Sequence, residues 1–404
     1  MVAGTQLDIA KVRGSFPALA GEQVFFDNAG GSQTLGTVID SIRDYLTNTN
    51  VQLGASYATG VKSTTKYDEG YKAAAKYINA SADDIVLGSS TTQLFRNVSY
   101  ALHFGEGDEI VVSKLDHEAN IAPWVALAER QGLLLKWWSP PAGTSPRLDA
   151  EGLGPLLSDR TRLVTLTHAS NILGTIHDVR AISAAVRARC PAALVCVDAV
   201  AYAPHRRVDV GDLGVDLYAF SWYKVYGPHI SMLYASGRAK AQLRSLGHYF
   251  NSHDTLEDKL GLAGASYELV AAIPAVVSYL DGQSTAAIEA HEARLSETLL
   301  RYLNGRTDGD VTVYGEKTAD SAVRVPTIAF TVKGWSSRDL VEALEKVTNF
   351  GFRWGNFYSV RLVQEFLGLP SSDGVVRVSM VHYNTVDEID TFVKALDEIL
   401  SSRP

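Results

Sequence analysis

Short runs of apolar and β-branched residues alternate along much of the chain with longer stretches in which apolar positions recur every three or four residues. Helix-type spacing of this kind covers Ala119–Arg130 and Val179–Arg189. Strands that alternate with helices indicate βαβ units and a mostly parallel sheet. Four continuous apolar runs predict strands that are buried on both faces, namely Glu109–Ser113, Arg162–Thr167, Leu194–Asp198 and Asp216–Phe220.

The pattern changes after Gly264. Ser284–Asn304 has the spacing of a long amphipathic helix, Thr327–Val332 that of a strand, and Thr385–Ser402 that of a closing helix. The cluster of Pro, Gly and Ser at Ser139–Pro146 predicts a surface loop. The sequence therefore predicts an α/β protein in which a large domain with a mixed, mostly parallel sheet (26–268) is joined by a smaller α+β domain (1–25 and 269–404).

Composition narrows the class of protein. The 404 residues are 46% hydrophobic and 20% charged, which is typical of a globular chain. The 37 basic and 45 acidic residues give a net charge of −8, which argues against a protein that binds nucleic acid. The apolar stretch Leu269–Leu280 contains Pro274 and is too short to span a bilayer. We expect neither a nucleic-acid partner nor a membrane partner.

The two cysteines, Cys190 and Cys196, are not accompanied by Cys/His pairs at the spacing of zinc ligands, so no metal site is predicted. The chain starts without a basic region followed by an apolar one, and we therefore expect no secretory signal. These features favour a cytoplasmic protein in a reducing compartment, with both thiols as structural residues.

The segment Tyr218–Pro228 carries the most distinctive local pattern. In it, Lys224 follows directly on a predicted strand, lies between aromatic residues, and precedes a Gly-Pro turn. Burial among aromatic rings disfavours the charged ammonium and lowers the pKa of a lysine, which imine-forming lysines require. Taken alone, the pattern fits a solvated lysine at a strand end better, and only the neighbouring motifs reverse that interpretation.

Polar residues follow other predicted strands at the same edge of the sheet. Asp198 ends an apolar strand, and a carboxylate there is placed to hold a pyridine nitrogen protonated, or simply to cap a turn. Gly88–Gln93 leads into a helix, whose N-terminal N–H groups favour a phosphate. His117, after a further strand, is placed either to stack on an aromatic ring or to serve a structural role.

Taken together and in this order along the chain, these segments resemble the class V aminotransferase family, and within it the branch that is similar to cysteine desulfurases. The resemblance runs from Phe26-Asp27-Asn28-Ala29 to Tyr383-Asn384-Thr385. Its most specific parts are His168–Thr175, His205–Val210 and the lysine segment. It implies a pyridoxal-phosphate enzyme of fold type I, with the architecture of aspartate aminotransferase, and a homodimer that completes each phosphate site from the partner.

The resemblance also implies roles for single residues. Lys224 forms the internal aldimine and moves protons, Asp198 pairs with the pyridine nitrogen, and His117 stacks on the ring. Arg377 clamps the α-carboxylate of an amino-acid substrate. Further cofactor ligands are Thr91, Thr92, Asn171, Ser221 and Ser266, and further substrate-binding residues are Arg353, Tyr57 and again Asn171.

The chain departs from the desulfurase pattern in the segment Gly351–Tyr358, where Tyr358 stands at the position of the persulfide cysteine. Without a thiolate there, no nucleophile accepts sulfur. Other departures agree, since Ala201, Tyr223 and the stretch Leu53–Ser56 replace polar or charged residues of the pattern. The aromatic residues Tyr57, Trp222, Trp354 and Tyr358 are candidates for a larger and less polar substrate pocket.

From these features we expect an enzyme that generates a Cα carbanion, stabilised as a quinonoid, from the external aldimine of an amino acid. Its fungal alkaloid-pathway relatives favour an intramolecular Mannich-type cyclisation, in which an aromatic pocket suits a cyclic cation. Two alternatives remain open at this stage. One is a C–S lyase or desulfurase-like β-elimination enzyme, and the other is a non-catalytic protein that keeps the fold.

Overall fold

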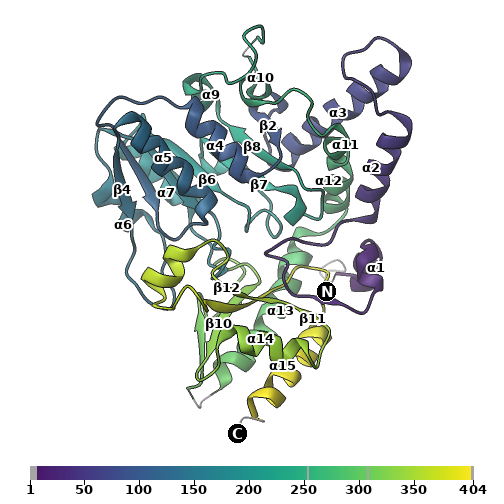
Figure 1. The fold of residues 1–404 in the computed structure, drawn as a ribbon, viewed down its shortest axis with the longest axis vertical. Helices are drawn as coiled ribbons and strands as arrows, with labels where there is room; N and C mark the ends of the chain where they lie inside the picture. Colours follow the sequence, from purple (N-terminus) through teal and green to yellow (C-terminus); the bar gives the residue numbers. More distant parts are fainter. Residues whose placement is uncertain (1–6, 253, 307–308, 402–404) are drawn as a thin grey trace.

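The computed structural model describes residues 7–252, 254–306 and 309–401, and is built around a central seven-stranded sheet (Figure 1). Strand order in this sheet is β2-β8-β7-β6-β5-β3-β4. All neighbouring strands are parallel except that β8 runs antiparallel to both β2 and β7. The strands are β2 (Ile85–Gly88), β3 (Glu109–Ser113), β4 (Leu134–Trp138), β5 (Thr161–Thr167), β6 (Leu194–Asp198), β7 (Leu217–Ser221) and β8 (Ser231–Ala235).

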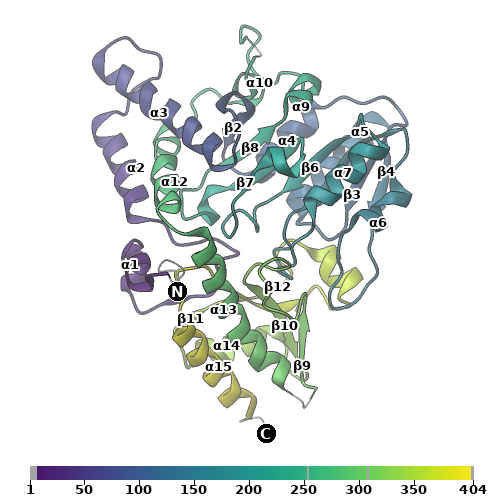
Figure 2. The same ribbon diagram turned by 180° about the vertical axis from the view of Figure 1, so that it is seen from behind.

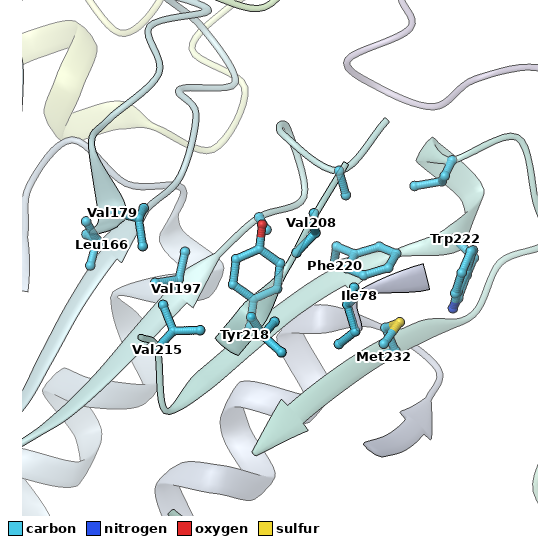
Figure 3. Packing of buried hydrophobic residues seen from close by; sticks show 14 of the residues in the cluster. Ile78, Leu166, Val179, Val197, Val208, Val215, Tyr218, Phe220, Trp222 and Met232 are labelled. Carbon is cyan, nitrogen blue, oxygen red and sulfur yellow. The ribbon is translucent and has the colours of Figure 1, made fainter. Parts of the chain in front are cut away.

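Helices cover both faces of this sheet because its inner strands are apolar on both sides. One face packs against α3 (Ala58–Tyr77), α7 (Val179–Arg189) and α12 (Ile273–Asp281). Figure 3 shows this core, in which Tyr218 and Phe220 of β7 lie between Val197 of β6 and Met232 of β8. The opposite face packs against α4 (Thr91–Ala101), α5 (Ala122–Gln131) and α10 (Leu256–Leu260).

Shorter and peripheral helices complete this part of the chain. Helix α2 runs beside α3 and α12 at one end of the sheet, so the segment after residue 268 still packs on the large domain (Figure 1, Figure 2). The domain limits expected from the sequence stay a prediction. The remaining α-helices before residue 272 are α1 (Ile9–Gly14), α2 (Gly36–Asn48), α6 (Ala150–Leu153), α8 (Val210–Leu213), α9 (Gly237–Gln242) and α11 (Tyr267–Val270).

A second sheet of four antiparallel strands, ordered β12-β13-β10-β9, forms the lower body in Figure 1. Three helices pack against it around their own apolar cluster. The two-residue strands β1 (Val24–Phe25) and β11 (Phe350–Gly351) pair beside it. The other elements are β9 (Val311–Tyr314), β10 (Thr327–Val332), β12 (Arg353–Gly355), β13 (Val375–Ser379), α13 (Thr285–Gly305), α14 (Ser337–Glu345) and α15 (Val386–Ser401).

A buried ion cluster joins the two bodies. His205 and Arg206, from a loop of the large body, contact the two carboxylate oxygens of Glu292 on α13 at 2.9 Å each. All three side chains are buried, so each charge has a partner where water is excluded. The motif His205–Val210, which the sequence singled out as specific, therefore connects the large body with α13.

The elements expected from the sequence are confirmed in position. Strand β3, strand β10 and helix α7 have the predicted limits, and the long helix α13 differs from its prediction by one residue at each end. Helix α5 starts later than predicted because a 3-10 turn, Glu118–Asn120, comes first. No helix in the described ranges combines the length and the apolar character that crossing a bilayer requires.

Candidate active site

A cavity opens at the carboxyl ends of the parallel strands, where open α/β sheets place their ligands. It gathers side chains from the ends of β6 and β7, from the start of α4, and from the loops after β3 and β5. A wider cleft shares Thr92, His117, Ala119 and Tyr223 with it and leads outward past Arg96 and Tyr358. The cavity is lined by Ser90, Thr91, Thr92, His117, Ala119, Thr167, Ala169, Asn171, Asp198, Val200, Ala201, Ser221, Tyr223 and Lys224.

Lys224 ends a 3-10 turn, Trp222–Lys224, that follows directly on β7. Its side chain is only 9% exposed, and no hydrogen bond or ion pair of its ammonium appears within the described part of the chain. Burial and the nearby Arg377 lower the pKa of Lys224 to about 8, against the opposing pull of Asp198. A substantial fraction of the amine is therefore neutral near neutral pH, which imine formation and proton transfer both need.

Asp198 is the last residue of β6, and its Oδ1 accepts a hydrogen bond from the backbone N–H of Val200 at 2.9 Å. Burial raises the pKa of Asp198 to about 6. Behind it lies a second buried acid, Asp116, whose pKa burial raises to about 7, with the charge of Asp198 contributing. Asp116 accepts a hydrogen bond from Asn120 on Oδ2, while its Oδ1 has no partner among the described residues.

His117 stands at the start of the 3-10 turn Glu118–Asn120, and its Nδ1 accepts a hydrogen bond from the N–H of Ala119 at 3.0 Å. Burial, together with the charges of Lys224 and Arg377, lowers the pKa of His117 to about 4. The imidazole is therefore neutral and suited to stacking. Its outer side contacts Tyr358, with 5.3 Å between ring centroids.

The opposite end of the cavity is the N-terminus of α4. Ser90 caps this helix through its hydroxyl, and Thr91 and Thr92 form the first helical positions. The hydroxyls of Thr91 and Ser221 lie 2.9 Å apart, and Ser221 also contacts Ser231 at 2.6 Å. Backbone N–H groups and hydroxyls at a helix start are suited to an anion, and phosphate binding by Thr91, Thr92 and Ser221 stays a prediction.

Two arginines share one carboxylate on the side of the cavity that faces the second sheet. Arg377 of β13 donates from Nη2 to Asp27 Oδ1 at 2.8 Å, and Arg353 of β12 contacts Asp27 Oδ2 at 2.5 Å. The two arginines are register partners on neighbouring antiparallel strands, which brings them together. Phe357 lies over the guanidinium of Arg377, with Cζ 3.7 Å from its ring centroid.

Asn171 connects the cavity with the arginine pair. Its Nδ2 donates to the carbonyl of Phe357 at 3.0 Å, and its own carbonyl accepts from Arg377 Nη1 at 3.0 Å. Gly174 makes the turn that presents Asn171 possible, because its φ is +71° and a Cβ there would lie 2.4 Å from the carbonyl of Thr327. The motif His168–Thr175 thus carries a cavity residue on a turn that is held against β10.

Several predicted site residues lie apart from the cavity in the single chain. Tyr57 caps α3 and is 54% exposed, and Ser266 caps α11 beside it; both lie at the far end of the large sheet (Figure 1). The assignment of Trp222 to the substrate pocket is wrong, since its ring is fully buried in the core shown in Figure 3. Trp354 packs with the second sheet and does not line the cavity.

The sequence missed some residues that the fold brings to the site. Asp27 was part of a recognised motif, yet nothing in the sequence paired it with both arginines. Asp116 precedes His117 directly, and its full burial followed from no local pattern. A lone acidic residue in a loop is usually solvated, so only its packing beneath Asn120 and Trp124 reveals it.

The donor set matches the polar groups of pyridoxal phosphate. A buried amine, a carboxylate without a cationic hydrogen-bond partner among the described residues, a neutral imidazole and a helix N-terminus meet in one cavity. These are the partners that an aldehyde, a pyridine nitrogen, an aromatic ring and a phosphate require. The residues present therefore fit the cofactor that the sequence predicted.

Comparison with known proteins gives the same answer. The family model "Aminotransferase class-V" matches residues 24–392. The chain belongs to this family. It is 54% identical over 406 residues, 99% of the chain and 100% of the relative, to the "Aminotransferase-like protein FGM3" of Gibberella zeae. It is 39% identical to the "Cysteine desulfurase-like protein ustD" of Aspergillus flavus, with 98% of this chain and 91% of that protein covered.

Solved structures of class-V relatives have the same fold. The cysteine desulfurase of Thermococcus onnurineus NA1 superposes with a TM-score of 0.88 at 24% identity over both complete chains. The cysteine desulfurase CsdA of Escherichia coli superposes with a TM-score of 0.85 at 25% identity, covering 98% of this chain and 99% of CsdA. The predicted fold type I architecture and the pyridoxal-phosphate cofactor are thereby confirmed.

Proposed function

We propose that this class-V chain breaks the Cα–H bond of a bound amino acid and uses that carbon to form a new bond within the same molecule. One observation carries the proposal: the cavity combines a buried amine, Lys224, with Asp198, and Tyr358 rather than a thiol stands beside it. Both described cysteines, Cys190 and Cys196, are buried in the core. The chain thus has the means to move a proton at Cα and no means to accept sulfur.

The residues of the chain divide the work. Lys224, with a pKa of about 8, accepts the Cα proton and then releases it to solvent or to the amine that ring closure produces, because the new C–C bond takes the place of the Cα–H bond. The N-terminus of α4, with Thr91 and Thr92, holds the phosphate, and Asp198 holds the ring nitrogen. His117 lies against the ring face. Pyridoxal phosphate itself supplies the electron sink for the pair that the broken Cα–H bond leaves behind.

Arg377 is the group that we assign to the substrate carboxylate, with Arg353 beside it. The guanidinium offers parallel N–H donors that match a carboxylate in two-point contact. Asn171 contacts both Arg377 and the loop that carries Phe357, and we assign it to the substrate or to the ring hydroxyl. Together these residues fix the amino acid so that its Cα–H bond lies toward Lys224.

For the reaction that follows, we propose an intramolecular Mannich-type ring closure in alkaloid biosynthesis. Support comes from the aromatic rings of Tyr223, Tyr358 and His117, which line the cleft outside the cavity and suit a cyclic iminium cation. Further support comes from the fungal relatives FGM3 and ustD, which cover nearly the whole chain. Expulsion of a substituent from Cβ, as in a C–S lyase, is the alternative reaction from the same set of residues.

The decisive experiment is a screen of amino acids, including ones that carry a cyclic imine, for changes in the visible absorbance of the holoenzyme, with products identified by mass spectrometry. Ring closure without loss of mass supports the proposal. Release of a thiol or sulfenate identifies the lyase. A cofactor-loaded protein whose spectrum responds to no amino acid identifies a non-catalytic descendant of the family.

We also propose a cytoplasmic homodimer in which Tyr57 and Ser266 reach the cavity of the partner. Both residues lie on the surface of the single chain, near exposed apolar side chains such as Leu46 and Val61. Ser266 would then add a donor to the phosphate site and Tyr57 an aromatic wall to the substrate site. A monomer in light scattering that is fully active at low concentration would contradict this arrangement.

A further inference from the structure

We propose that Phe357 is a specificity-determining residue that covers the guanidinium of Arg377, so that a carboxylate binds this arginine only after Phe357 has moved away. The inference rests on the proposed function, because it takes Arg377 as the group that binds the substrate carboxylate. It assigns a role in specificity to a residue of the segment Gly351–Tyr358, which the sequence showed only as a departure from the desulfurase pattern.

The first observation is the position of the Phe357 ring. Its centroid lies 3.7 Å from Cζ of Arg377 and 5.4 Å from Cζ of Arg353, so one ring serves two guanidinium groups. The face of an aromatic ring is electronegative, and it attracts a cation and repels an anion. The ring and a substrate carboxylate therefore compete for the same positive charge.

The second observation is that Arg377 has no open donor. Its side chain is 2% exposed and does not line the cavity around Lys224. Nη2 is bound to Asp27 and Nη1 to the carbonyl of Asn171, while Nε is buried without a hydrogen-bond partner among the described residues. A buried N–H without a partner is costly, and a carboxylate would satisfy it. No carboxylate reaches it while the cover stays in place.

The third observation is that the cover is a strained loop. Phe357 and Tyr358 are consecutive non-glycine residues with φ of 47° and 60°, a conformation that bulky side chains rarely adopt. Asn171 Nδ2 donates to Phe357 O, and the Glu118 N–H donates to Tyr358 O. On either side of these two residues, Asn356 Nδ2 donates to Ser371 O and Ser359 Oγ donates to Asn171 Oδ1. Movement of the loop would relax both residues, and it would break the Asn171 contact next to Arg377.

The test compares glycine with glycinamide, which lacks the carboxylate, as ligands of the holoenzyme in titration calorimetry. Phe357→Ala and Phe357→Leu both remove the aromatic ring, and thermal unfolding shows whether each variant folds. Val360→Ala is the control, because Val360 lies in the same segment, is exposed, and lines neither the cavity nor the outer cleft. If the alanine variant fails to fold, the leucine variant, which keeps an apolar side chain of similar bulk, provides the measurement.

We expect both Phe357 variants to bind glycine about 3- to 30-fold more tightly than the unmodified protein, in line with the strength of a partly buried cation–π contact. Binding of glycinamide should stay unchanged, and Val360→Ala should keep the original ratio of the two dissociation constants. Unchanged or weaker glycine binding by a folded Phe357 variant overturns the inference, since the ring would then support the site instead of covering it.

Arg377→Lys separates this inference from the proposed function. If the preference for glycine over glycinamide survives this substitution, Arg377 does not bind the carboxylate and the proposed function of that residue fails. If the preference is lost while the Phe357 variants bind glycine as the unmodified protein does, only the covering role of Phe357 fails. Absence of glycine binding in every protein would contradict the assignment of an amino-acid carboxylate to Arg377.

Discussion

The two sides of the cavity are built differently. On the side of the large sheet, Lys224, Asp198 and the start of α4 come from neighbouring strand ends and direct their polar groups into the cavity. On the side of the second sheet, Asp27, Arg353 and Arg377 satisfy one another, and Phe357 covers them. The first side presents polar groups that fit pyridoxal phosphate, whereas on the second side the charged groups are paired with one another and covered.

The difference between the two sides of the cavity indicates which residues select the substrate. The residues that we propose to hold pyridoxal phosphate match the class-V pattern, whereas the departures Ala201, Tyr223 and Tyr358 line the cavity or the outer cleft. Groups that always bind the same cofactor can lie on rigid strand ends. Groups that must select a substrate lie on the small sheet and on a strained loop, where a change of one side chain alters access without disturbing the sheet.

The largest effect that we expect on the cofactor side comes from Lys224→Ala. Loss of the one lysine in the cavity should lower kcat by at least about 10³- to 10⁴-fold, since this amine both forms the imine and accepts the Cα proton. Cofactor should still be retained in part, because the helix N-terminus and Asp198 remain. Steady-state kinetics on the cofactor-loaded variant measure this, with Lys66→Ala, which removes a surface ion pair to Asp44, as the control. Appreciable turnover in Lys224→Ala would refute its role.

On the substrate side, Arg377→Lys keeps a positive charge but loses the planar pair of donors. We expect KM for the amino acid to rise about 10- to 100-fold with a smaller change in kcat, because the lost contact serves binding more than proton transfer. Arg338→Lys, on the surface of α14 in an ion pair with Glu342, is a matched control. A fall in kcat at unchanged KM would mean that Arg377 acts in the chemical step and not in substrate binding.

A third variant, Asp116→Asn, examines the acid behind the cofactor side. The folded protein holds the Asp116 proton up to pH about 7, whereas an unfolded chain releases it near pH 4. The folded state therefore binds more protons in this window, and its stability falls as the pH rises. Asparagine has no such proton to lose. Between pH 5 and pH 8 we therefore expect the free energy of unfolding of Asp116→Asn to fall by on the order of 2 kcal/mol less than that of the unmodified protein.

Urea unfolding of the unmodified protein and of Asp116→Asn at pH 5, 6, 7 and 8 measures this difference directly. The variant should lose less stability than the unmodified protein between pH 5 and pH 7. Parallel pH profiles of the two proteins would show that Asp116 does not carry its proton in the folded state. Asp116 would then be an ionised neighbour of Asp198.

The smallest effect concerns the thiols. Replacing both cysteines by alanine should leave the chemical step unchanged, because Cys196 is buried in the sheet and Cys190 caps α7, with its thiol 3.0 Å from the carbonyl of Ser158. Burial raises the pKa of Cys196, so it does not act as a thiolate. The loss of packing should lower the free energy of unfolding by about 1–2 kcal/mol. Turnover lost in a folded, cofactor-loaded double variant would mean that a cysteine takes part.

The reverse substitution, Tyr358→Cys, sharpens the same point. Tyr358 is 71% exposed and lies against His117, so a thiol there would stand at the entrance of the cavity. We expect no efficient desulfurase from this change alone, because Tyr223, Ala201 and the Leu53–Ser56 stretch still differ from the desulfurase pattern. Sulfide release from cysteine, measured with a reductant present, checks this expectation. Efficient release would show that one residue separates the two activities.

The sequence by itself determined the large sheet, because its strands are continuous apolar runs that have no other stable place than a buried parallel sheet. It also placed Lys224, Asp198 and His117 after predicted strands, whose carboxyl ends meet at one edge of a parallel sheet, while their roles toward the cofactor came from the resemblance to the class V family and stay predictions. Lys224, Asp198 and His117 could therefore be predicted together. Their neighbourhood follows from chain order and sheet geometry, without any knowledge of side-chain packing.

Only the tertiary structure decided the substrate side. Asp27 and Arg377 are 350 residues apart, and antiparallel register alone places Arg353 opposite Arg377. Burial of Asp116 depends on the packing of Asn120 and Trp124 within the large body. The position of Phe357 over a guanidinium depends on how its loop contacts Asn171 of the large body. Long-range contacts of this kind leave no local pattern, because charged residues look alike in sequence whether water or another charge surrounds them.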